Sequence, residues 1–407
     1  AIRRQRQMCI RDSFFDSHPK WYWYLPLFLL MWGILIFVSW LVKKMPLITG
    51  GGIPQTRGVI NGRVAYKHPF IEVIAKFVGG ILALSTGLSL GREGPSVQIG
   101  SYVGCLVSKW GRVLAGERKQ LLAAGAGAGL AAAFAAPLAS SLLVIESIER
   151  FDAPKTAITT LLAGVVAGGV ASWLFPINPY FQIDAIVPGM TFWSQVKLFL
   201  LLAAVVSVFG KFFSVTTLQV KRIYPAIKHP EYVKMLYLLF IAFLISMAEF
   251  NLTGGGEQFL LSQAMHPDTH ILWIVGMMLL HLVFSIFSFS SGLPGGNFIP
   301  TLVTGGLLGQ IVALIMVRQG LIAYENISYI MLICMSAFLV AVVRTPLTAI
   351  VLITEITGHL EVFYPSIVVG GLTYYFTEML QIKPLNVTLY EDMIHSPAFK
   401  EEARYTL

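Results

Sequence analysis

The chain has 407 residues, of which 56% are hydrophobic and only 12% are charged, and its mean hydropathy is +0.72. Soluble domains carry about 25% charged residues, so this composition excludes an ordinary water-soluble domain. The net charge of +8 does not indicate nucleic acid as a partner, because Lys43, Lys44 and Arg118 lie between apolar segments, where membrane proteins carry basic residues. Three scattered cysteines imply neither a disulfide framework nor a metal site, and no cofactor is expected.

Long apolar segments predict an all-α, polytopic protein whose partner is the lipid bilayer. The first is an uncharged run of 22 residues, which as a helix would be about 33 Å long and would cross a hydrocarbon core of about 30 Å. In chain order, helices are predicted at Trp21–Val42, Phe70–Leu90, Val97–Trp110, Gln120–Phe134, Leu138–Ile148, Ala157–Phe175, Phe192–Ile223, Tyr232–Phe250, Gly256–Ala264, Ile271–Phe287, Phe298–Val317, Tyr329–Val343, Leu347–Ile356, Pro365–Leu380 and Pro384–Ile394.

Breaks between these helices recur at nearly constant spacing. Pro95 is followed 42 residues later by Pro137, and Pro300 is followed 46 residues later by Pro346. The corresponding prolines of the two halves are 205 and 209 residues apart. Paired breaks at matching positions of two halves are typical of a transporter and point to its binding site. We therefore expect a first repeat over residues 14–223 and a second over residues 224–394.

Two charges stand in apolar surroundings in Gly91-Arg92-Glu93-Gly94-Pro95. Charged residues at membrane depth usually mark an ion pathway. The glycines leave backbone N–H groups bare and Pro95 suits the first turn of a helix, so the motif predicts a helix N-terminus directed at an anion. Glu93 would compete with that anion when ionised, which couples anion occupancy to proton uptake; the alternative is a structural carboxylate that caps the helix.

A single helix N-terminus stabilises an anion by at most about 2 kcal/mol, whereas dehydrating an ion costs several kcal/mol. Several helix starts must therefore converge, and two further glycine-rich breaks, Gly50–Pro54 and Gly295–Pro300, also end in proline. Irregular backbone at membrane depth is tolerated only where protein shields it or where it lines a cavity. These breaks are accordingly predicted to surround the anion.

The three motifs resemble those of the CLC family of chloride channels and H⁺/Cl⁻ exchange transporters, in its prokaryotic form. Gly91–Pro95 matches the family's G-R-E-G-P, and Gly296–Pro300 matches G-x-F-x-P. Gly50–Pro54 is similar to G-S-G-I-P, with Gly51 in place of the usual serine. The resemblance extends from about Trp21 to Ile394.

This resemblance implies a homodimer in a bacterial inner membrane, with inverted repeats of broken and tilted helices. It implies proton-coupled chloride exchange with Glu93 as gate and proton carrier; the alternative is a passive voltage- or pH-gated channel for chloride or another small anion. It implies an anion site formed by Gly51, Gly52, Ile53, Arg92, Gly94, Asn297, Phe298, Ile299 and Asn386.

The chain departs from the family pattern at two kinds of position. A tyrosine is expected after Lys-Pro-Leu, but Asn386 stands there, so either its amide or Tyr390 from the next turn replaces the hydroxyl. The inner proton-relay glutamate of the family aligns with Ser147, which favours the channel alternative. Glu146 beside it is interpreted as a structural carboxylate, with a proton relay as the alternative. Lys76 either supplies positive potential to the pore or snorkels to the membrane surface.

The two ends of the sequence are interpreted separately from the repeats. Residues 1–13 are basic and patternless and are interpreted as a non-native leader. The family has two helices before the one predicted at Trp21–Val42, so the first repeat is expected to be truncated at its start. Residues 395–407 are expected to form a short tail without a regulatory domain.

An enzyme is not expected. Gly87-Leu88-Ser89-Leu90-Gly91 matches the G-x-S-x-G pattern of hydrolases. That pattern requires a preceding strand and a histidine partner, whereas here it lies in a predicted membrane helix.

Overall fold

The protein is a bundle of α-helices, as predicted. The computed structural model describes residues 24–149, 154–174, 181, 183–265 and 270–396, and within these ranges the only extended pairing is a single bridge between Gly91 and Gly296. The α-helices are α2 (Tyr24–Lys44), α3 (Ile53–Ile60), α4 (Pro69–Ser85), α5 (Glu93–Trp110), α6 (Ala115–Phe134), α7 (Pro137–Leu143), α8 (Pro154–Leu174), α9 (Phe192–Ile223), α10 (Glu231–Ala248), α11 (Glu257–Met265), α12 (Ile271–Ser290), α13 (Phe298–Arg318), α14 (Ile327–Val343), α15 (Pro346–Thr357), α16 (Phe363–Met379) and α17 (Leu385–Ile394). Short helical turns are η3 (Pro46–Ile48), η4 (Val144–Glu149), η5 (Tyr224–Ala226), η6 (Phe250–Leu252), η7 (Tyr324–Asn326) and η8 (Leu360–Val362).

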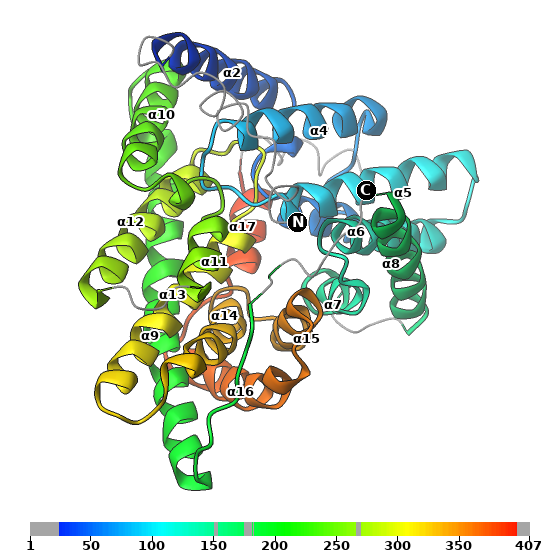
Figure 1. Ribbon diagram of the computed structural model, residues 1–407. Coiled ribbons are helices and arrows are strands. Elements are labelled where there is room, and N and C mark those ends of the chain that lie inside the picture. Colours follow the sequence, from blue (N-terminus) through cyan, green and yellow to red (C-terminus); the bar gives the residue numbers. More distant parts are fainter. Residues whose placement is uncertain (1–23, 150–153, 175–180, 182, 266–269, 397–407) are drawn as a thin grey trace.

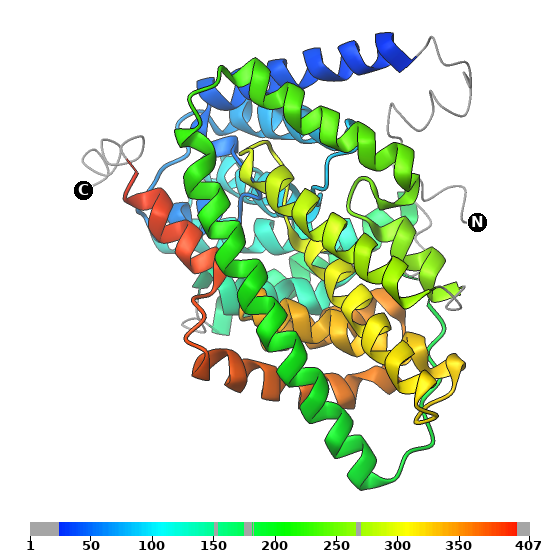
Figure 2. The ribbon, with the colours of Figure 1, turned by 90° about the vertical axis from the view of Figure 1, so that its left-hand side faces the viewer.

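Seven of the described helices are long and apolar enough to cross a membrane, judged by length and composition. Among them, α13 and α14 occupy the interior, and every residue of α14 is buried. The longest helix, α9, runs obliquely along one face of the molecule (Figure 2). A fully apolar helix in the centre and apolar side chains on the outer helices are typical of a protein that is surrounded by lipid.

Two helix pairs at corresponding places of the halves approach unusually closely. On α5, Gly100 and Gly104 lie against the backbone of α6, and on α13, Gly305 and Gly309 lie against α14; a side chain at any of the four would collide with the facing helix. Each glycine of α5 precedes its counterpart in α13 by 205 residues, which equals the spacing of Pro95 and Pro300. Small residues four apart allow such contact, so the repeat is expressed in packing as well as in the breaks.

The two halves also exchange helix caps where α7 and α15 lie side by side (Figure 1). The Glu146 carboxylate accepts hydrogen bonds from the backbone N–H groups of Leu347 (3.0 Å) and Thr348 (2.8 Å) and from the Thr348 hydroxyl (2.6 Å). Glu355 in turn accepts the two N–H groups at the start of α7, at 3.0 and 2.8 Å. Each glutamate therefore satisfies N–H groups that a helix start leaves without an intrahelical partner.

Helix boundaries near the breaks differ from the predicted ones. The helix predicted at Phe70–Leu90 ends at Ser85, because Gly87 has a φ of 77° and Ser89 bonds to serines of α12 instead of continuing the helix. The following helix starts at Glu93, four residues earlier than predicted. The break at Gly50–Pro54 indicated a helix start, but the bounds of α3 were not predicted, because its eight residues are too few for a clear apolar period.

Candidate anion-binding site

Three glycine-rich connections meet in the middle of the molecule. The first, second and third breaks cover residues 49–52, 86–92 and 291–297. Gly91 and Gly296 exchange backbone hydrogen bonds of 2.6 and 2.7 Å, which join the second break to the third. Gly50 donates to Gly292 (3.2 Å) and accepts from Gly295 (3.1 Å), which joins the first break to the third. Segments more than 200 residues apart are thus held together by their own main chains.

The helices that follow these breaks, α3, α5 and α13, begin without a side-chain cap. The residues preceding them are Gly52, Arg92 and Asn297, and none bonds through its side chain to the first turn. Gly52 has a φ of 89°, a conformation that favours glycine. Uncapped N–H groups at three neighbouring helix starts, together with the helix dipoles, create an environment suited to an anion.

The starts of α3 and α5 touch at Gly51 and Gly94. A side chain on Gly94 would collide with the backbone of Gly51. At Gly51 itself, an added Cβ would find its nearest neighbour, the Gly296 Cα, at 3.4 Å, which is ordinary contact. Gly94 is therefore sterically required, whereas Gly51 leaves room for a small side chain.

A cavity of about 490 Å³ opens beside this junction and is bounded on its other side by α17. We call it the α17 cavity. It is lined by Thr49, Gly50, Gly51, Ile53, Pro54, Gln55, Gly94, Lys221, Arg222, Pro225, Phe289, Gly296, Asn297, Phe298, Asn386, Leu389, Asp392, Met393, His395 and Ser396.

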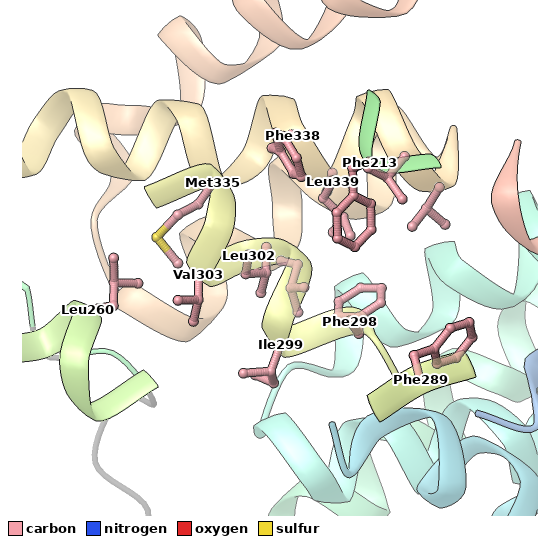
Figure 3. Packing of buried hydrophobic residues seen from close by; sticks show 14 of the residues in the cluster. Phe213, Leu260, Phe289, Phe298, Ile299, Leu302, Val303, Met335, Phe338 and Leu339 are labelled. Atoms are coloured by element: carbon pink, nitrogen blue, oxygen red, sulfur yellow. The ribbon is translucent and has the colours of Figure 1, made fainter. Parts of the chain in front are cut away.

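Six of the nine predicted anion-site residues line the α17 cavity: Gly51, Ile53, Gly94, Asn297, Phe298 and Asn386. The other three do not. Gly52 lies behind the cavity wall as the residue before α3, and Arg92 and Ile299 lie on the side of Glu93. Figure 3 shows the side chains of Phe298 and Ile299 extending from the start of α13 into the apolar core, which leaves the main chain of α13 to provide the polar groups.

Glu93, the first residue of α5, is 1% exposed. Its carboxylate folds back over Gly91, where any side chain would overlap it. Neither carboxylate oxygen has a hydrogen-bond partner of ordinary geometry among the described residues. The carboxylate interacts electrostatically with Arg92, with Glu257 and with the Ile299 backbone N–H at the start of α13. Burying an acid without such partners is costly, and within the described part of the chain no hydrogen bond of ordinary geometry holds the Glu93 carboxylate in place.

Lys76 and Arg92 lie behind the first and second breaks. Lys76 is 0% exposed, and its ammonium donates to the carbonyls of Ile48 (2.8 Å) and Gly50 (2.7 Å). It therefore does not snorkel to the membrane surface, and its two hydrogen bonds hold the first break in place. Half-buried Arg92 lines, with Lys76, a second cavity of about 320 Å³ between α4 and α5.

The two residues considered as substitutes for the missing tyrosine differ in position. Asn386, in the first turn of α17, lines the α17 cavity. Tyr390 is not among the lining residues, and its ring instead lies under the Arg57 guanidinium, whose carbon is 5.0 Å from the ring centroid. Of the two, only Asn386 lines the cavity, so a role for its amide in anion binding stays a prediction.

Glu146 and Ser147 lie away from this cavity, in the π-helical turn η4. Glu146 is committed to the start of α15 by the three hydrogen bonds described above. Ser147 is half-buried in the same turn and carries no titratable group.

Two residues of this region, Lys221 and Gln98, were not predicted from the sequence to belong to the site. Lys221, near the end of α9, lines the α17 cavity, but the pair Lys221-Arg222 resembles the basic residues that commonly follow membrane helices. Gln98 donates to the Leu47 carbonyl (2.8 Å) and so holds the chain that leads into the first break. The sequence around Gln98 does not reveal this contact, because the two residues are 51 positions apart.

Broken helices that converge on an internal cavity, a buried acid and several apolar spans define a multi-pass membrane protein with a path for anions. The family described as voltage gated chloride channel matches residues 34–378. The chain belongs to this family, as its three motifs predicted.

Similar proteins cover most of the chain. An H(+)/Cl(-) exchange transporter ClcA of Klebsiella pneumoniae (strain 342) is 30% identical over 94% of this chain and 81% of its own length. An H(+)/Cl(-) exchange transporter ClcA of Vibrio cholerae is 31% identical over 91% of this chain and 80% of its own length. The solved structure of a slow cyanobacterial Cl⁻/H⁺ antiporter has a TM-score of 0.85 and 26% identity, covering 96% of this chain and 92% of that one.

Proposed function

We propose that this protein exchanges chloride for protons across a membrane, with Glu93 as the gate. The observation that carries the proposal is the position of Glu93. It is a buried acid at one of three adjoining helix starts, and neither of its carboxylate oxygens has a hydrogen-bond partner of ordinary geometry among the described residues. Similar proteins named H(+)/Cl(-) exchange transporters support chloride and protons as the transported ions.

The anion is bound by dipoles more than by fixed charge. Each helix start contributes at most about 2 kcal/mol, and the N–H groups of α3, α5 and α13 act together because the breaks are bonded to one another. Such multi-centre, moderate binding compensates for lost hydration and still permits release. The ionised Glu93 carboxylate presents the same kind of charge to the same helix starts, so it competes with the anion, and protonation removes it as a competitor.

Exchange and passive conduction make different demands on Glu93. In exchange, each proton taken up by the carboxylate is linked to anion movement, whereas in a channel the same acid only opens or closes the path. Ser147, which replaces the family's inner glutamate, is the feature that favours a channel. The relatives named as exchangers favour coupling.

Reconstituted liposomes provide the test. A chloride gradient imposed at equal pH is expected to drive protons in the opposite sense and to acidify or alkalinise the lumen, recorded with a trapped pH dye. Under an imposed pH gradient, the reversal potential is expected to shift away from the chloride equilibrium potential. Chloride flux with no proton movement and an unshifted reversal potential would leave only the channel.

The similar proteins are membrane transporters, which supports transport as the function. We propose a bacterial inner membrane as its location, because the similar exchangers are bacterial proteins. The protein moves small anions and protons, and no resident cofactor is assigned to it.

We also propose a homodimer that packs through α7, α15 and their neighbours. Glu146 and Glu355 are only half-buried on this face, and carboxylates facing lipid are costly. Exposed Leu138 and Leu347 beside them provide apolar contact area. A second copy would cover both. Light scattering in detergent should give about twice the chain mass of 44.8 kDa, and a single-chain mass would contradict this assembly.

A further inference from the structure

The α17 cavity contains an ammonium group that no part of the transport mechanism has yet used. Lys221 of α9 lies on its wall, with Nζ 4.5 Å from the centroid of the Phe289 ring. Among the described residues it forms no hydrogen bond and no ion pair. A cation that rests on an aromatic face is partly desolvated but remains free to move.

In the described part of the chain, the other charged or titratable residues of the cavity wall have bonding partners, unlike Lys221. Arg222, the next residue, also lines the cavity, but its guanidinium is joined to the Asp392 carboxylate by two hydrogen bonds of 3.1 and 3.0 Å. Asp392 acts on Lys221 through space while remaining bonded to Arg222. His395 is the remaining titratable group on the wall, and its ring nitrogen pairs with a backbone carbonyl at 2.7 Å.

A second unpaired donor lies beside the same cavity. Asn297 lines the cavity and is 9% exposed, and its Nδ2 is buried without a hydrogen-bond partner among the described residues. A buried amide donor without an acceptor costs about 1–3 kcal/mol. Lys221 and Asn297 thus bring two donor groups to one cavity, and among the described residues no acceptor is bonded to either.

Lys76 lies behind the first break, close to Lys221. Its amino group bonds the Gly50 carbonyl from behind that break, and Lys221 Nζ lies on the cavity side, 3.8 Å from where a Cβ of Gly50 would be. The two amino groups act on each other electrostatically, and within the described part of the chain neither is bonded to a carboxylate. Like charges in a partly desolvated region repel strongly, and a mobile anion beside Lys221 would offset that repulsion.

We propose that Lys221 and the side-chain amide of Asn297 form an anion subsite in the α17 cavity, which takes a small, partly dehydrated monovalent anion of halide type. The proposal deepens the proposed function and rests on it. It also explains how the chain manages with Gly51 and Asn386, where hydroxyl groups were expected: a side-chain ammonium supplies the attraction. Because Lys221 rests on Phe289 and is not locked in an ion pair, it can accompany the anion without trapping it.

Chloride binding to the purified protein, followed by titration calorimetry at constant ionic strength with gluconate as the replacement anion, tests this subsite. Lys221→Gln is expected to raise the chloride dissociation constant about tenfold, because one unscreened charge is lost from the site. Lys221→Met, which keeps the aliphatic stem on Phe289, is expected to behave alike, and Lys221→Arg should stay within about twofold of wild type. Asn297→Ala is expected to weaken binding about threefold.

Lys211→Gln is the matched control. Lys211 lies on the same helix, is exposed, and donates to the Leu380 carbonyl (3.2 Å) outside the α17 cavity. The substitution removes the same charge and should leave chloride binding unchanged. Equal weakening by Lys211→Gln and Lys221→Gln would overturn the proposal, because the effect would then come from total charge.

A measurement on the wild-type protein keeps the proposal testable if the Lys221 variants fail to fold. Crystals grown in bromide are expected to show an anomalous peak beside Lys221 Nζ, and absence of any peak in the cavity would overturn the proposal. Failure of the proposed function looks different: wild-type vesicles would then show no proton movement coupled to chloride. Coupled transport in wild type together with unaltered chloride binding in Lys221→Gln would refute the subsite alone.

Discussion

Two pairs of related helix starts in this protein use the same backbone groups in opposite ways. The starts of α7 and α15 are each capped by a glutamate from the other half, with hydrogen bonds of 2.6–3.0 Å. The starts of α5 and α13 have no side-chain cap, although Glu93 is the first residue of α5. The repeat thus provides two pairs of corresponding helix starts. Carboxylates cap the pair formed by α7 and α15, and no side chain of the preceding residue caps the pair formed by α5 and α13; we call the second pair open.

The difference lies in where the carboxylate comes from and what holds it. Glu146 and Glu355 reach across from a facing helix, and their oxygens are engaged by two or three donors. Glu93 turns back over Gly91, and its oxygens have no hydrogen-bond partner of ordinary geometry in the described chain. The hydrogen-bonded carboxylates of Glu146 and Glu355 stabilise the fold. The Glu93 carboxylate lies near its helix start without such bonds, so it can move away when a proton or an anion binds.

The largest effect is expected at Glu93, the acid of the open pair. Glu93→Gln keeps the size of the side chain but cannot take up or release a proton. Proton movement should fall to the level of empty vesicles, and chloride flux should persist and lose its pH dependence, because a neutral amide no longer competes with the anion. Paired recordings of proton and chloride flux in liposomes measure both effects.

Glu117→Gln is a suitable control for the loss of one carboxylate. Glu117 is exposed at the start of α6 and accepts from the Leu114 backbone N–H (3.2 Å), a bond that glutamine can also make. Its coupling should match wild type. If Glu93→Gln kept normal pH dependence, the distinction between capping and competing carboxylates would collapse.

A smaller effect, on stability rather than on coupling, is expected at the capped pair. Glu146→Ala should lower the free energy of unfolding by about 2 kcal/mol, since it leaves helix N–H groups and a hydroxyl without their charged acceptor. Glu355→Ala should cost somewhat less, because it removes two hydrogen bonds where Glu146→Ala removes three. Thermal unfolding in detergent measures both.

Glu146→Ala also distinguishes a helix cap from a proton relay. Folded Glu146→Ala protein should retain its ratio of protons to chloride in the flux assay, because the role of Glu146 is to hold α15. Loss of proton movement with an unchanged unfolding temperature would instead make Glu146 part of the proton path. The distinction between Glu146 as a helix cap and Glu93 as a proton carrier would then be wrong.

The sequence predicted the all-α membrane fold, the repeat and the three breaks, because each leaves a mark in local composition. Runs of apolar residues, glycine-proline punctuation and the 205-residue spacing are all visible without a structure. Through the resemblance of three motifs it also named nine anion-site residues, of which six line one cavity; their role in binding an anion stays a prediction.

What the sequence could not provide are relations between distant side chains. The exchange of caps between Glu146 and Glu355 needs α7 and α15 to lie together. The two glutamates are 209 residues apart, like Pro137 and Pro346, but this spacing does not show that each caps the helix of the other half. The position of Lys221 on the cavity wall depends on the course of α9, 32 residues long, and a basic residue at a helix end has many ordinary explanations. The bounds of α3 were not predicted because eight residues show little periodicity.

The smallest effect is expected at Gly51, where the open helix starts lack the family's hydroxyl. Gly51→Ser should fold normally, because an added Cβ meets nothing closer than the Gly296 Cα at 3.4 Å and the residue has no positive φ. Its hydroxyl would face the α17 cavity and donate to the anion, so chloride should bind about threefold to tenfold more tightly. Titration calorimetry with chloride and bromide measures the gain.

Gly94→Ser shows whether the gain comes from the open space at residue 51. The same hydroxymethyl group on Gly94 would run into the Gly51 carbonyl carbon and Cα, within 2.9 Å of its Cβ. That variant should lose folded yield and chloride binding together, because the starts of α3 and α5 must separate to admit it. Equal tolerance of both serines would mean that the two helix starts are not in contact in the working protein, and the convergence of open N-termini would have to be abandoned as the source of anion affinity.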